Sequence, residues 1–431
     1  MATIKIGAAA PDSFSGFLFD DIDRMVRTST RLTLYNDTAT DVSQTLVLEG
    51  SGFRYTSGQA YDGTITEVRA YDSEGRLLIT YSDLSVDLPR FLVTLTVAGS
   101  YDATGFLING NDRLYGSTGN DDLDGGAGND YIAAGRGDDF VADFTGRDTL
   151  DGGAGFDEIS FANDLYDGWH RVGGVVLDAL TGAATDPWGY SNVIRNFESF
   201  TGSYQKDVLK GSNTSTYTEV FRGLLGNDTI DGRGGLDRVE YDRDAYYGGK
   251  LAVTVNLAKG IARDGFGNTD RLYNIEQAGG STYNDKLIGN AAANQLYGHN
   301  GNDTLDGGAG NDVLTGGKGI DNLTGGAGKD TFAFNYSTEG WDRIRDFSNT
   351  DDTISVSSSG FGGVLSTGTI SRNQLVRNED PHATLAHGQF LYDTDSGVLS
   401  WDVDGTGSTA AVRIAVLSGA ASIFYSDITV Y

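Results

Sequence analysis

Residues 298–333 read GHNGNDTLD, GGAGNDVLT, GGKGIDNLT and GGAGKDTFA, four consecutive blocks of nine residues with one shared pattern. Each block begins with glycine-rich positions, carries Asp at position six and has a large apolar residue at position eight. The same pattern fills residues 280–333 and 107–160, and it recurs four times in residues 202–240, where one block holds three extra residues. A fixed short period is typical of a solenoid, in which each repeat stacks on its neighbours.

Position six is Asp in fourteen of the sixteen blocks, with Glu219 and Asn294 as the exceptions. Acidic residues number 60 of 431, about one in seven, so composition does not explain this column. The glycines allow turns with positive φ, and the residues after the Asp predict a short strand with one side chain pointing inward. One inward apolar side chain per block is too little to form a hydrophobic core. Stacked coils must therefore bury these side chains together in a continuous apolar column. The turns place carbonyl oxygens beside a carboxylate, and such hard ligands suit Ca²⁺.

The composition limits the functional classes. The formal net charge is −29, and the chain has no Cys. Disulfides, Cys-ligated zinc, Fe–S clusters and Cys nucleophiles are thereby excluded. A surface this acidic repels phosphate, so we expect no nucleic-acid partner and instead a metal cation. No apolar stretch is long enough to predict a membrane span, and residues 1–20 lack the apolar core of an N-terminal signal peptide.

The GGxGxDxUx blocks resemble the calcium-binding nonapeptides of RTX proteins. In that family two nonapeptides form one coil of a parallel β-roll, and Ca²⁺ lies between turns on the same side. The resemblance therefore implies an all-β fold, a right-handed parallel β-roll or β-solenoid, with ligand pairs eighteen residues apart and up to about ten Ca²⁺ ions. The implied metal ligands are Asp112, Asp121, Asp130, Asp139, Asp148, Asp157, Asp207, Asp228, Asp237, Asp285, Asp303, Asp312, Asp321 and Asp330.

Several turns depart from the family pattern. Asp143 and Phe144 replace the glycine pair in the first set of blocks, and the insertion perturbs the pairs Asp207–Asp228 and Glu219–Asp237. Position four is not glycine in the opening turns of the second and third sets. We expect these turns to bind Ca²⁺ weakly or not at all.

The segments between the repeats are copies of each other at an offset of 78 residues. VVLDALTG at 175–182 matches VTVNLAKG at 253–260, and NVIRNFESFTGS at 192–203 matches DRLYNIEQAGGS at 270–281. We expect both segments to form broader coils that continue the stack. The duplicated pairs Asn196/Glu198 and Asn274/Glu276 either add metal ligands or, as is usual for buried polar groups, form structural hydrogen bonds.

The ends of the chain differ from the repeats. Residues 1–105 alternate apolar and polar residues in the segments 32–37, 44–56, 63–72, 75–84 and 91–99, with turns at Asn36-Asp37, Asp62-Gly63 and Glu74-Gly75. This pattern predicts a small antiparallel β module. DRIRDFSNTDDTISV at 342–356 and YDTDSGVLSWDVDG at 392–405 resemble the strand pair and hairpin of the serralysin-like C-terminal domain of type I-secreted RTX proteins. That resemblance implies an uncleaved export signal ending at Tyr431 and contact with a type I secretion apparatus.

The expected organisation is a β module, three repeat blocks with two solenoid spacers between them, and a β capping and secretion domain. In order these are residues 1–105, 106–160, 161–201, 202–240, 241–279, 280–333 and 334–431.

Enzyme signatures are absent from the sequence: it contains no HExxH, no G-x-S-x-G and no Walker loop. We therefore expect a secreted, non-enzymatic protein that folds on binding Ca²⁺ and serves at the cell surface or in extracellular matrix, as an adhesive, S-layer-like or biofilm component. Expected partners are Ca²⁺, further copies of the chain or surface polysaccharide. The alternatives are an enzyme acting on extracellular polysaccharide and a lectin-like glycan-binding protein.

Overall fold

The computed structural model describes residues 3–6, 24–27, 31–36, 44–56, 59–71, 77–87, 111–143, 145–162, 173–419 and 421–431. The chain divides into two compact units, Met1–Lys210 and Gly211–Tyr431. Within the described residues the regular structure is β-strand and short 3₁₀ helix, without α-helix. None of those residues form a helix long and apolar enough to cross a membrane. The chain is therefore all-β.

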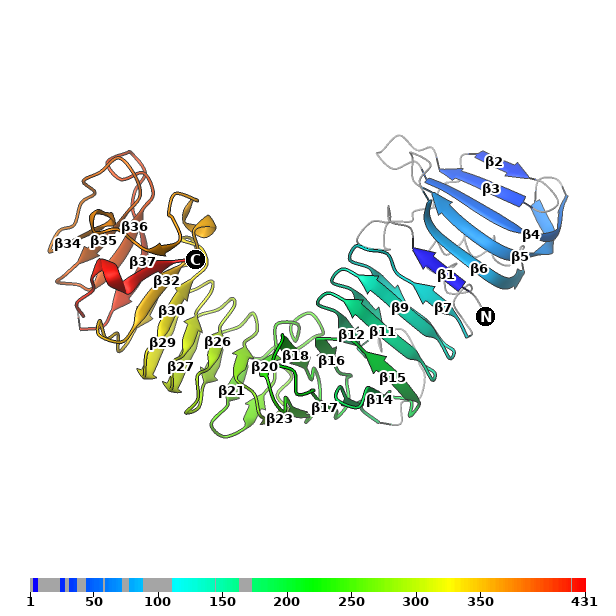
Figure 1. Cartoon of the computed structure of the whole chain (residues 1–431), viewed down its shortest axis with the longest axis horizontal. Helices are drawn as coiled ribbons and strands as arrows, with labels where there is room; N and C mark the ends of the chain where they lie inside the picture. Colours follow the sequence, from blue (N-terminus) through cyan, green and yellow to red (C-terminus); the bar gives the residue numbers. More distant parts are fainter. Residues whose placement is uncertain are drawn as a thin grey trace. The chain divides into compact units, whose positions relative to one another are not determined.

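The first unit begins with an antiparallel sheet in the order β2–β3–β4–β5–β6–β1, drawn in blue in Figure 1. β1 also pairs in parallel with β7 of the first repeat block, so this sheet continues into the roll. The predicted turn at Asp62-Gly63 is wrong, because Asp62 pairs with Arg54 inside the β4–β5 ladder. The predicted strand 91–99 and turn at Glu74-Gly75 lie outside the described residues. The bounds are β1 Thr3–Ile6, β2 Arg24–Arg27, β3 Arg31–Asn36, β4 Gln44–Thr56, β5 Gln59–Tyr71 and β6 Leu77–Asp87.

The first repeat block is a β-roll of two parallel sheets that the chain visits alternately. One sheet stacks β7, β9 and β11, and the other stacks β8, β10 and β12. Leu114, Ile132 and Leu150 lie opposite one another eighteen residues apart, and each is at most 3% exposed. Burying such side chains stabilises the fold by about 1.5–3 kcal/mol each. The bounds are β7 Arg113–Tyr115, β8 Asp122–Asp124, β9 Tyr131–Arg136, β10 Phe140–Ala142, β11 Thr149–Ala154 and β12 Glu158–Ser160.

The first spacer continues both sheets but also adds a hairpin. β15 stacks on β11 and β16 on β12, as expected of a solenoid coil. β13 and β14, however, run antiparallel between β15 and β17, which the sequence-based interpretation did not include. Residues 163–172 of this spacer lie outside the described part of the chain. The bounds are β13 Val176–Asp178, β14 Ala183–Thr185, β15 Ser191–Arg195, β16 Ser199–Thr201 and β17 Val208–Lys210.

The second unit repeats this arrangement. One sheet runs β19–β23–β22–β21–β25–β27–β29–β31, and the other runs β18–β20–β24–β26–β28–β30–β32. The rungs β27 and β29 stand side by side in Figure 1. The bounds are β18 Thr218–Arg222, β19 Thr229–Asp231, β20 Leu236–Glu240, β21 Thr254–Asn256, β22 Ile261–Arg263, β23 Thr269–Tyr273, β24 Gln277–Gly279, β25 Lys286–Ile288, β26 Gln295–Tyr297, β27 Thr304–Ala309, β28 Val313–Thr315, β29 Asn322–Ala327, β30 Thr331–Phe334, β31 Asp342–Ile344 and β32 Thr353–Val356.

The second spacer makes the two sheets unequal in length. The hairpin β21–β22 separates β23 from β25 in one sheet, whereas β24 pairs directly with β26 in the other. Two extra strands add about 9.6 Å to one sheet at ~4.8 Å per strand. At this spacer one sheet of the stack is therefore two strands longer than the other.

A C-terminal cap closes the second unit. β37 continues one sheet beside β31, β38 continues the other beside β32, and Phe361, Phe390 and Trp401 form its buried aromatic centre. The predicted strand pair at 342–356 corresponds to β31 and β32, and the predicted hairpin at 392–405 corresponds to β35 and β36. The bounds are η2 Ser359–Phe361, β33 Gly368–Thr369, η3 Arg372–Gln374, β34 Leu375–Asn378, β35 Gln389–Asp393, β36 Val398–Asp402, β37 Val412–Leu417, η4 Tyr425–Asp427 and β38 Ile428–Val430.

Candidate metal sites

The position-six aspartates form hydrogen-bonded columns along the rolls. The backbone N–H of Asp303 donates to Oδ1 of Asp321, and that of Asp312 donates to Oδ1 of Asp330. The other eighteen-residue links, with donor distances of 2.6–2.8 Å, join Asp112 to Asp130, Asp121 to Asp139, Asp130 to Asp148, Asp139 to Asp157, Asp285 to Asp303 and Asn294 to Asp312. The structure thus has the expected eighteen-residue stacking of these carboxylates.

The second oxygen of many of these carboxylates has no protein partner. Oδ2 is buried without a hydrogen bond in Asp139, Asp157, Asp303, Asp312, Asp321 and Asp330. In five of them it lies under the first glycine of the same turn, as where a Cβ built on Gly152 would approach Oδ2 of Asp157 to 2.9 Å; Asp139, whose turn begins with Ala134, is the exception. Because a buried carboxylate oxygen without a partner is costly, these oxygens suit the coordination of a cation.

Burial and like charges oppose ionisation of the columns. Burial, followed by the charges of Asp321, Asp285 and Asp342, raises the pKa of Asp303 to about 8. Burial and the charges of Asp148, Asp112 and Asp124 raise the pKa of Asp130 to about 8. The pKa of Asp139 rises to about 7 and that of Asp312 to about 6 for the same reasons. A bound divalent cation removes this penalty, since it supplies the positive charge that the column lacks.

Three of the turns that begin with Gly-Ser have a different arrangement. Ser117, Ser203 and Ser281 occupy position two, and their backbone N–H groups donate to Oδ2 of Asp121, Asp207 and Asp285 at 2.5–2.7 Å. Each serine Oγ accepts the N–H two residues later, which holds this closed turn. In the glycine-pair turns position two has positive φ, as in Gly308 and Gly326, and no such bond forms. The sequence contained this signal, a Gly-Ser in place of Gly-Gly.

The spacers extend the columns with residues that the repeat pattern did not identify. Glu198 accepts the N–H of Asp157, and Glu276 accepts that of Asp237. In the same way, Asn192 accepts the N–H of Asp148, and Asp270 accepts that of Asp228. In the cap, Asp342 accepts the N–H of Asp321 and Asp352 accepts that of Asp330, so these two residues are the last members of the columns. The 78-residue duplication identified Glu198 and Glu276 as candidates, and it also aligns Asn192 with Asp270, which the sequence analysis did not identify.

The duplicated asparagines have a structural role. Asn196 and Asn274 adopt positive φ, and their Nδ2 atoms donate to Asp151 and Asp231 at 2.7 Å. The sequence left two roles open for the pairs Asn196/Glu198 and Asn274/Glu276, metal ligation or structural hydrogen bonding. In the structure the asparagines stabilise the turn, and the glutamates belong to the carboxylate columns.

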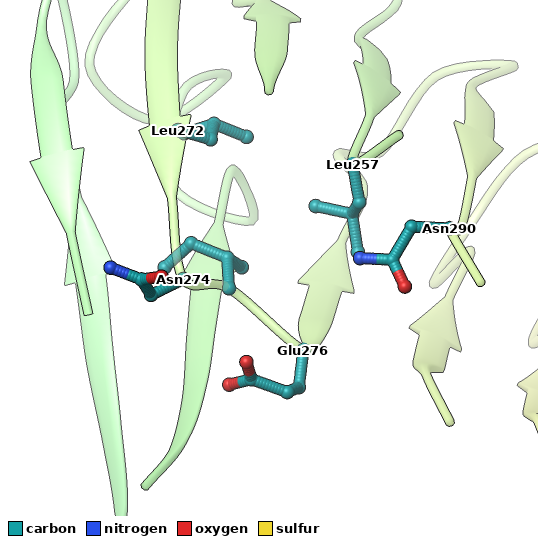
Figure 2. Close-up of a pocket in the computed structure, with 6 residues that line it drawn as sticks. Leu257, Leu272, Asn274, Glu276 and Asn290 are labelled. Carbon is teal, nitrogen blue, oxygen red and sulfur yellow. The ribbon is translucent and has the colours of Figure 1, made fainter. Parts of the chain in front are cut away.

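A cavity of about 250 Å³ lies at the second spacer. Figure 2 shows Asn274, Glu276 and Asn290 around it, with Leu272 of β23 and Leu257, which directly follows β21. Burial raises the pKa of Glu276. The cavity belongs to the same column of turns, because Glu276 joins two of its members. The Glu276 carboxylate accepts the Asp237 N–H, and the Glu276 backbone carbonyl accepts a hydrogen bond from Nδ2 of Asn294.

Metal binding here depends on backbone oxygens as well as carboxylates. In the part of the chain that the structure describes, no group of three or more His, Asp or Glu side chains is arranged to hold a metal ion by itself. The fourteen predicted aspartates all lie in the described turns and are buried, and their role as ligands stays a prediction. A Ca²⁺ ion would take one carboxylate oxygen and turn carbonyls, and it would supply charge neutralisation and a cross-link between coils.

Comparisons with known proteins agree with this chemistry. Residues 108–141, 144–160, 213–246, 279–314 and 306–335 match the family model of the RTX calcium-binding nonapeptide repeat (4 copies). The chain therefore carries RTX-type calcium-binding repeats, and Ca²⁺ is the ion that such repeats bind. No curated protein matches the sequence.

Two solved structures show a partial likeness. The AlgE6R3 subunit of the Azotobacter vinelandii mannuronan C5-epimerase is 29% identical over 34% of this chain and 78% of that one, with a TM-score of 0.24. The extracellular lipase LipA from Serratia marcescens is 20% identical over 75% of this chain and 40% of its own, also with a TM-score of 0.24. These scores are too low to carry a conclusion about this chain.

Proposed function

We propose that this protein is a secreted, calcium-loaded scaffold with a non-enzymatic role at the cell surface or in extracellular matrix. The observation that carries the proposal is the buried Oδ2 atom without a protein partner in six aspartates of these columns, Asp139, Asp157, Asp303, Asp312, Asp321 and Asp330. A chain with a formal charge of −29 cannot pack such columns cheaply without cations.

Calcium binding and folding are coupled in this proposal. At low Ca²⁺ the columns repel and the coils stay open, whereas at about millimolar Ca²⁺, typical of extracellular modules, the turns fill and the rolls close. An unfolded chain in the cell suits export through a narrow channel, with the C-terminal segment as the export signal. Folding then follows on the outside.

The exposed apolar side chains of the second spacer support a role in assembly. Tyr246 is 83% exposed, and Leu251, Ile261 and Tyr273 are also exposed. Exposed apolar side chains that form a contiguous patch favour contact with another macromolecule. A second copy of this chain is the partner that a layer or matrix requires.

The test is circular dichroism and sedimentation velocity on metal-free protein titrated with Ca²⁺. We expect a cooperative gain of β-structure, followed by species larger than the monomer. Folding without assembly would remove the matrix role and leave a calcium-folded binding protein or enzyme, to be separated by glycan arrays and polysaccharide-degradation assays. An absence of any calcium response would overturn the proposal entirely.

A further inference from the structure

The outer face of one sheet in the second unit carries a row of side chains without a carboxylate. The strands β23, β22, β21, β25, β27, β29 and β31 are successive neighbours in this sheet. Their pairing aligns one residue from each strand, in the order Thr269, Arg263, Thr254, Lys286, Thr304, Asn322 and Arg343. At ~4.8 Å per strand this cationic row is about 29 Å long.

The cationic row faces solvent. Asn322 is half-buried, and the other six residues of the row are exposed. The residue that follows each of them along its strand is buried, as Leu287 after Lys286 and Ile344 after Arg343 show. The row is therefore open to a partner along its whole length.

A second row on the same face adds two more cations and one acid. It consists of Arg271, Ile261, Asn256, Ile288, Asp306, Thr324 and Arg345. Arg345 directly follows β31, and its guanidinium donates to Oδ1 of Asn322 in the cationic row. The two rows together hold five cations and one carboxylate, a formal charge of +4 (5 − 1), on a chain whose formal charge is −29.

The cations of this face are not neutralised by the protein. Within the described residues no carboxylate forms an ion pair with Arg263, Arg271, Lys286 or Arg343. At the cap end of the face, the guanidinium groups of Arg343 and Arg413 lie over the ring of Trp341, at 4.7 and 5.1 Å from its centroid. Because like charges on one face repel one another, an anion bound along the rows would stabilise the face.

The spacing of the cations suits an extended anion. Arg263 and Lys286 are two strands apart, about 9.6 Å, and Lys286 and Arg343 are three strands apart, about 14 Å. A small anion cannot contact all three, whereas a linear polymer with repeated negative groups can. The partner is therefore a chain that lies across the strands, along the axis of the stack.

The uncharged residues of the rows favour a polysaccharide over a nucleic acid. Threonine hydroxyls and the Asn322 amide stand between the cations, and these groups both donate and accept hydrogen bonds, as sugar hydroxyls require. Single-stranded nucleic acids are held by aromatic side chains that stack on the bases. Neither row contains an aromatic residue.

The acidic surroundings make this binding depend on Ca²⁺. Asp303 and Asp321 directly precede Thr304 and Asn322 of the cationic row, and they belong to the columns that are expected to take up Ca²⁺. Charges farther away than about 8 Å are screened at physiological ionic strength. Once Ca²⁺ fills the neighbouring turns, the field at the face is that of its own cations.

We propose that these two rows bind a linear polysaccharide that carries carboxylate or sulfate groups, with the polymer laid along the stack of strands. The inference rests on the proposed function, because it names a partner for a protein of the cell surface or extracellular matrix. Arg263, Lys286 and Arg343 supply the charge that recognises the polymer, and the residues between them hydrogen-bond to its sugar rings.

The test measures binding of full-length, Ca²⁺-loaded protein to immobilised carboxymethylcellulose by biolayer interferometry, with hydroxyethylcellulose as the uncharged polymer. We expect binding to the charged polymer alone, weakening as the salt concentration rises. The triple variant Arg263→Gln, Lys286→Gln, Arg343→Gln should bind about tenfold more weakly, since it removes three ion pairs. The matched control is Lys250→Gln, Lys329→Gln, Arg372→Gln, which removes three exposed cations outside the rows and should bind like the native chain.

Equal losses in the two triple variants, equal binding to the two polymers, or no binding by the native chain would each overturn the proposal. The same holds if the first variant keeps polymer binding but loses the species larger than the monomer in sedimentation velocity, because the rows would then contact a second copy of the chain. If that variant does not fold, Lys286→Gln against Lys329→Gln should show a difference of about two- to fivefold.

Circular dichroism during a Ca²⁺ titration without polymer tests the proposed function separately. A native calcium response together with no polymer binding would overturn this inference alone.

Discussion

The backbone N–H of Asp303 donates to Oδ1 of Asp321 at 2.6 Å, while Oδ2 of both carboxylates stays buried without a partner. One oxygen of each aspartate therefore links successive coils, and the other is left for a cation. Every full glycine-pair turn in the third repeat block repeats this division. Stability and calcium affinity consequently depend on the same side chains.

Replacing Asp312 by Asn separates these two contributions. The amide keeps an Oδ1 that accepts the Asn294 N–H, but it removes the charge. We expect the Ca²⁺ concentration at half-folding to rise about tenfold, or ~1.4 kcal/mol, measured by circular dichroism. Without calcium the variant should fold slightly better than the native chain, because a buried charge is gone.

The matched control is Asp207→Asn. Asp207 already accepts hydrogen bonds from Val175 and from both the N–H and the hydroxyl of Ser203. Its replacement should lower stability with little change in calcium dependence. Equal shifts of the calcium midpoint in both variants would contradict the assignment of the second oxygen to a metal.

Acidification should fold the metal-free protein. The pKa of Asp130 and of Asp303 is raised from 3.8 to about 8 by burial and neighbouring carboxylates. A raised folded-state pKa means that the folded state binds protons more tightly. This stabilisation is complete below about pH 4 and is lost as the pH rises towards 8.

Protons and Ca²⁺ then compete for the same carboxylates, so the calcium needed for folding should increase as the pH falls. Circular dichroism of metal-free protein between pH 4 and pH 8, with and without added Ca²⁺, checks both signs. A metal-free chain that folds better at pH 8 than at pH 5 would refute this account.

Ser117→Gly should create or strengthen a calcium turn. The change converts residues 116–121 from GSTGND to GGTGND, the full repeat pattern. It removes the serine hydroxyl that accepts the Gly119 N–H, and it permits the positive φ seen at position two elsewhere. We expect tighter or additional Ca²⁺ binding by calorimetry. Ser203→Gly is the comparison, because Gln205 still departs from the pattern there, and an equal gain in both would count against the turn geometry.

The repeat period predicted most of the fold because one inward residue per nine fixes both the coil and its core. Leu114, Ile132 and Leu150 could be placed from spacing alone, and the structure stacks them as expected. The hairpins of the spacers could not be predicted, since alternating strands look the same whether they run parallel or antiparallel. Asp143 was interpreted as a defective glycine because its partners, Asp186 and Asn192, lie more than forty residues away in sequence.

The C-terminal strand should stabilise the cap of the second unit. Ile428 is fully buried opposite Ile354, in parallel pairing between β38 and β32. Ile428→Ala should therefore lower the free energy of unfolding by about 2–5 kcal/mol, measured by urea denaturation at saturating Ca²⁺. Thr429→Ala, on the half-exposed side of the same strand, should cost much less. Equal effects of the two substitutions would mean that Ile428 is not packed against β32.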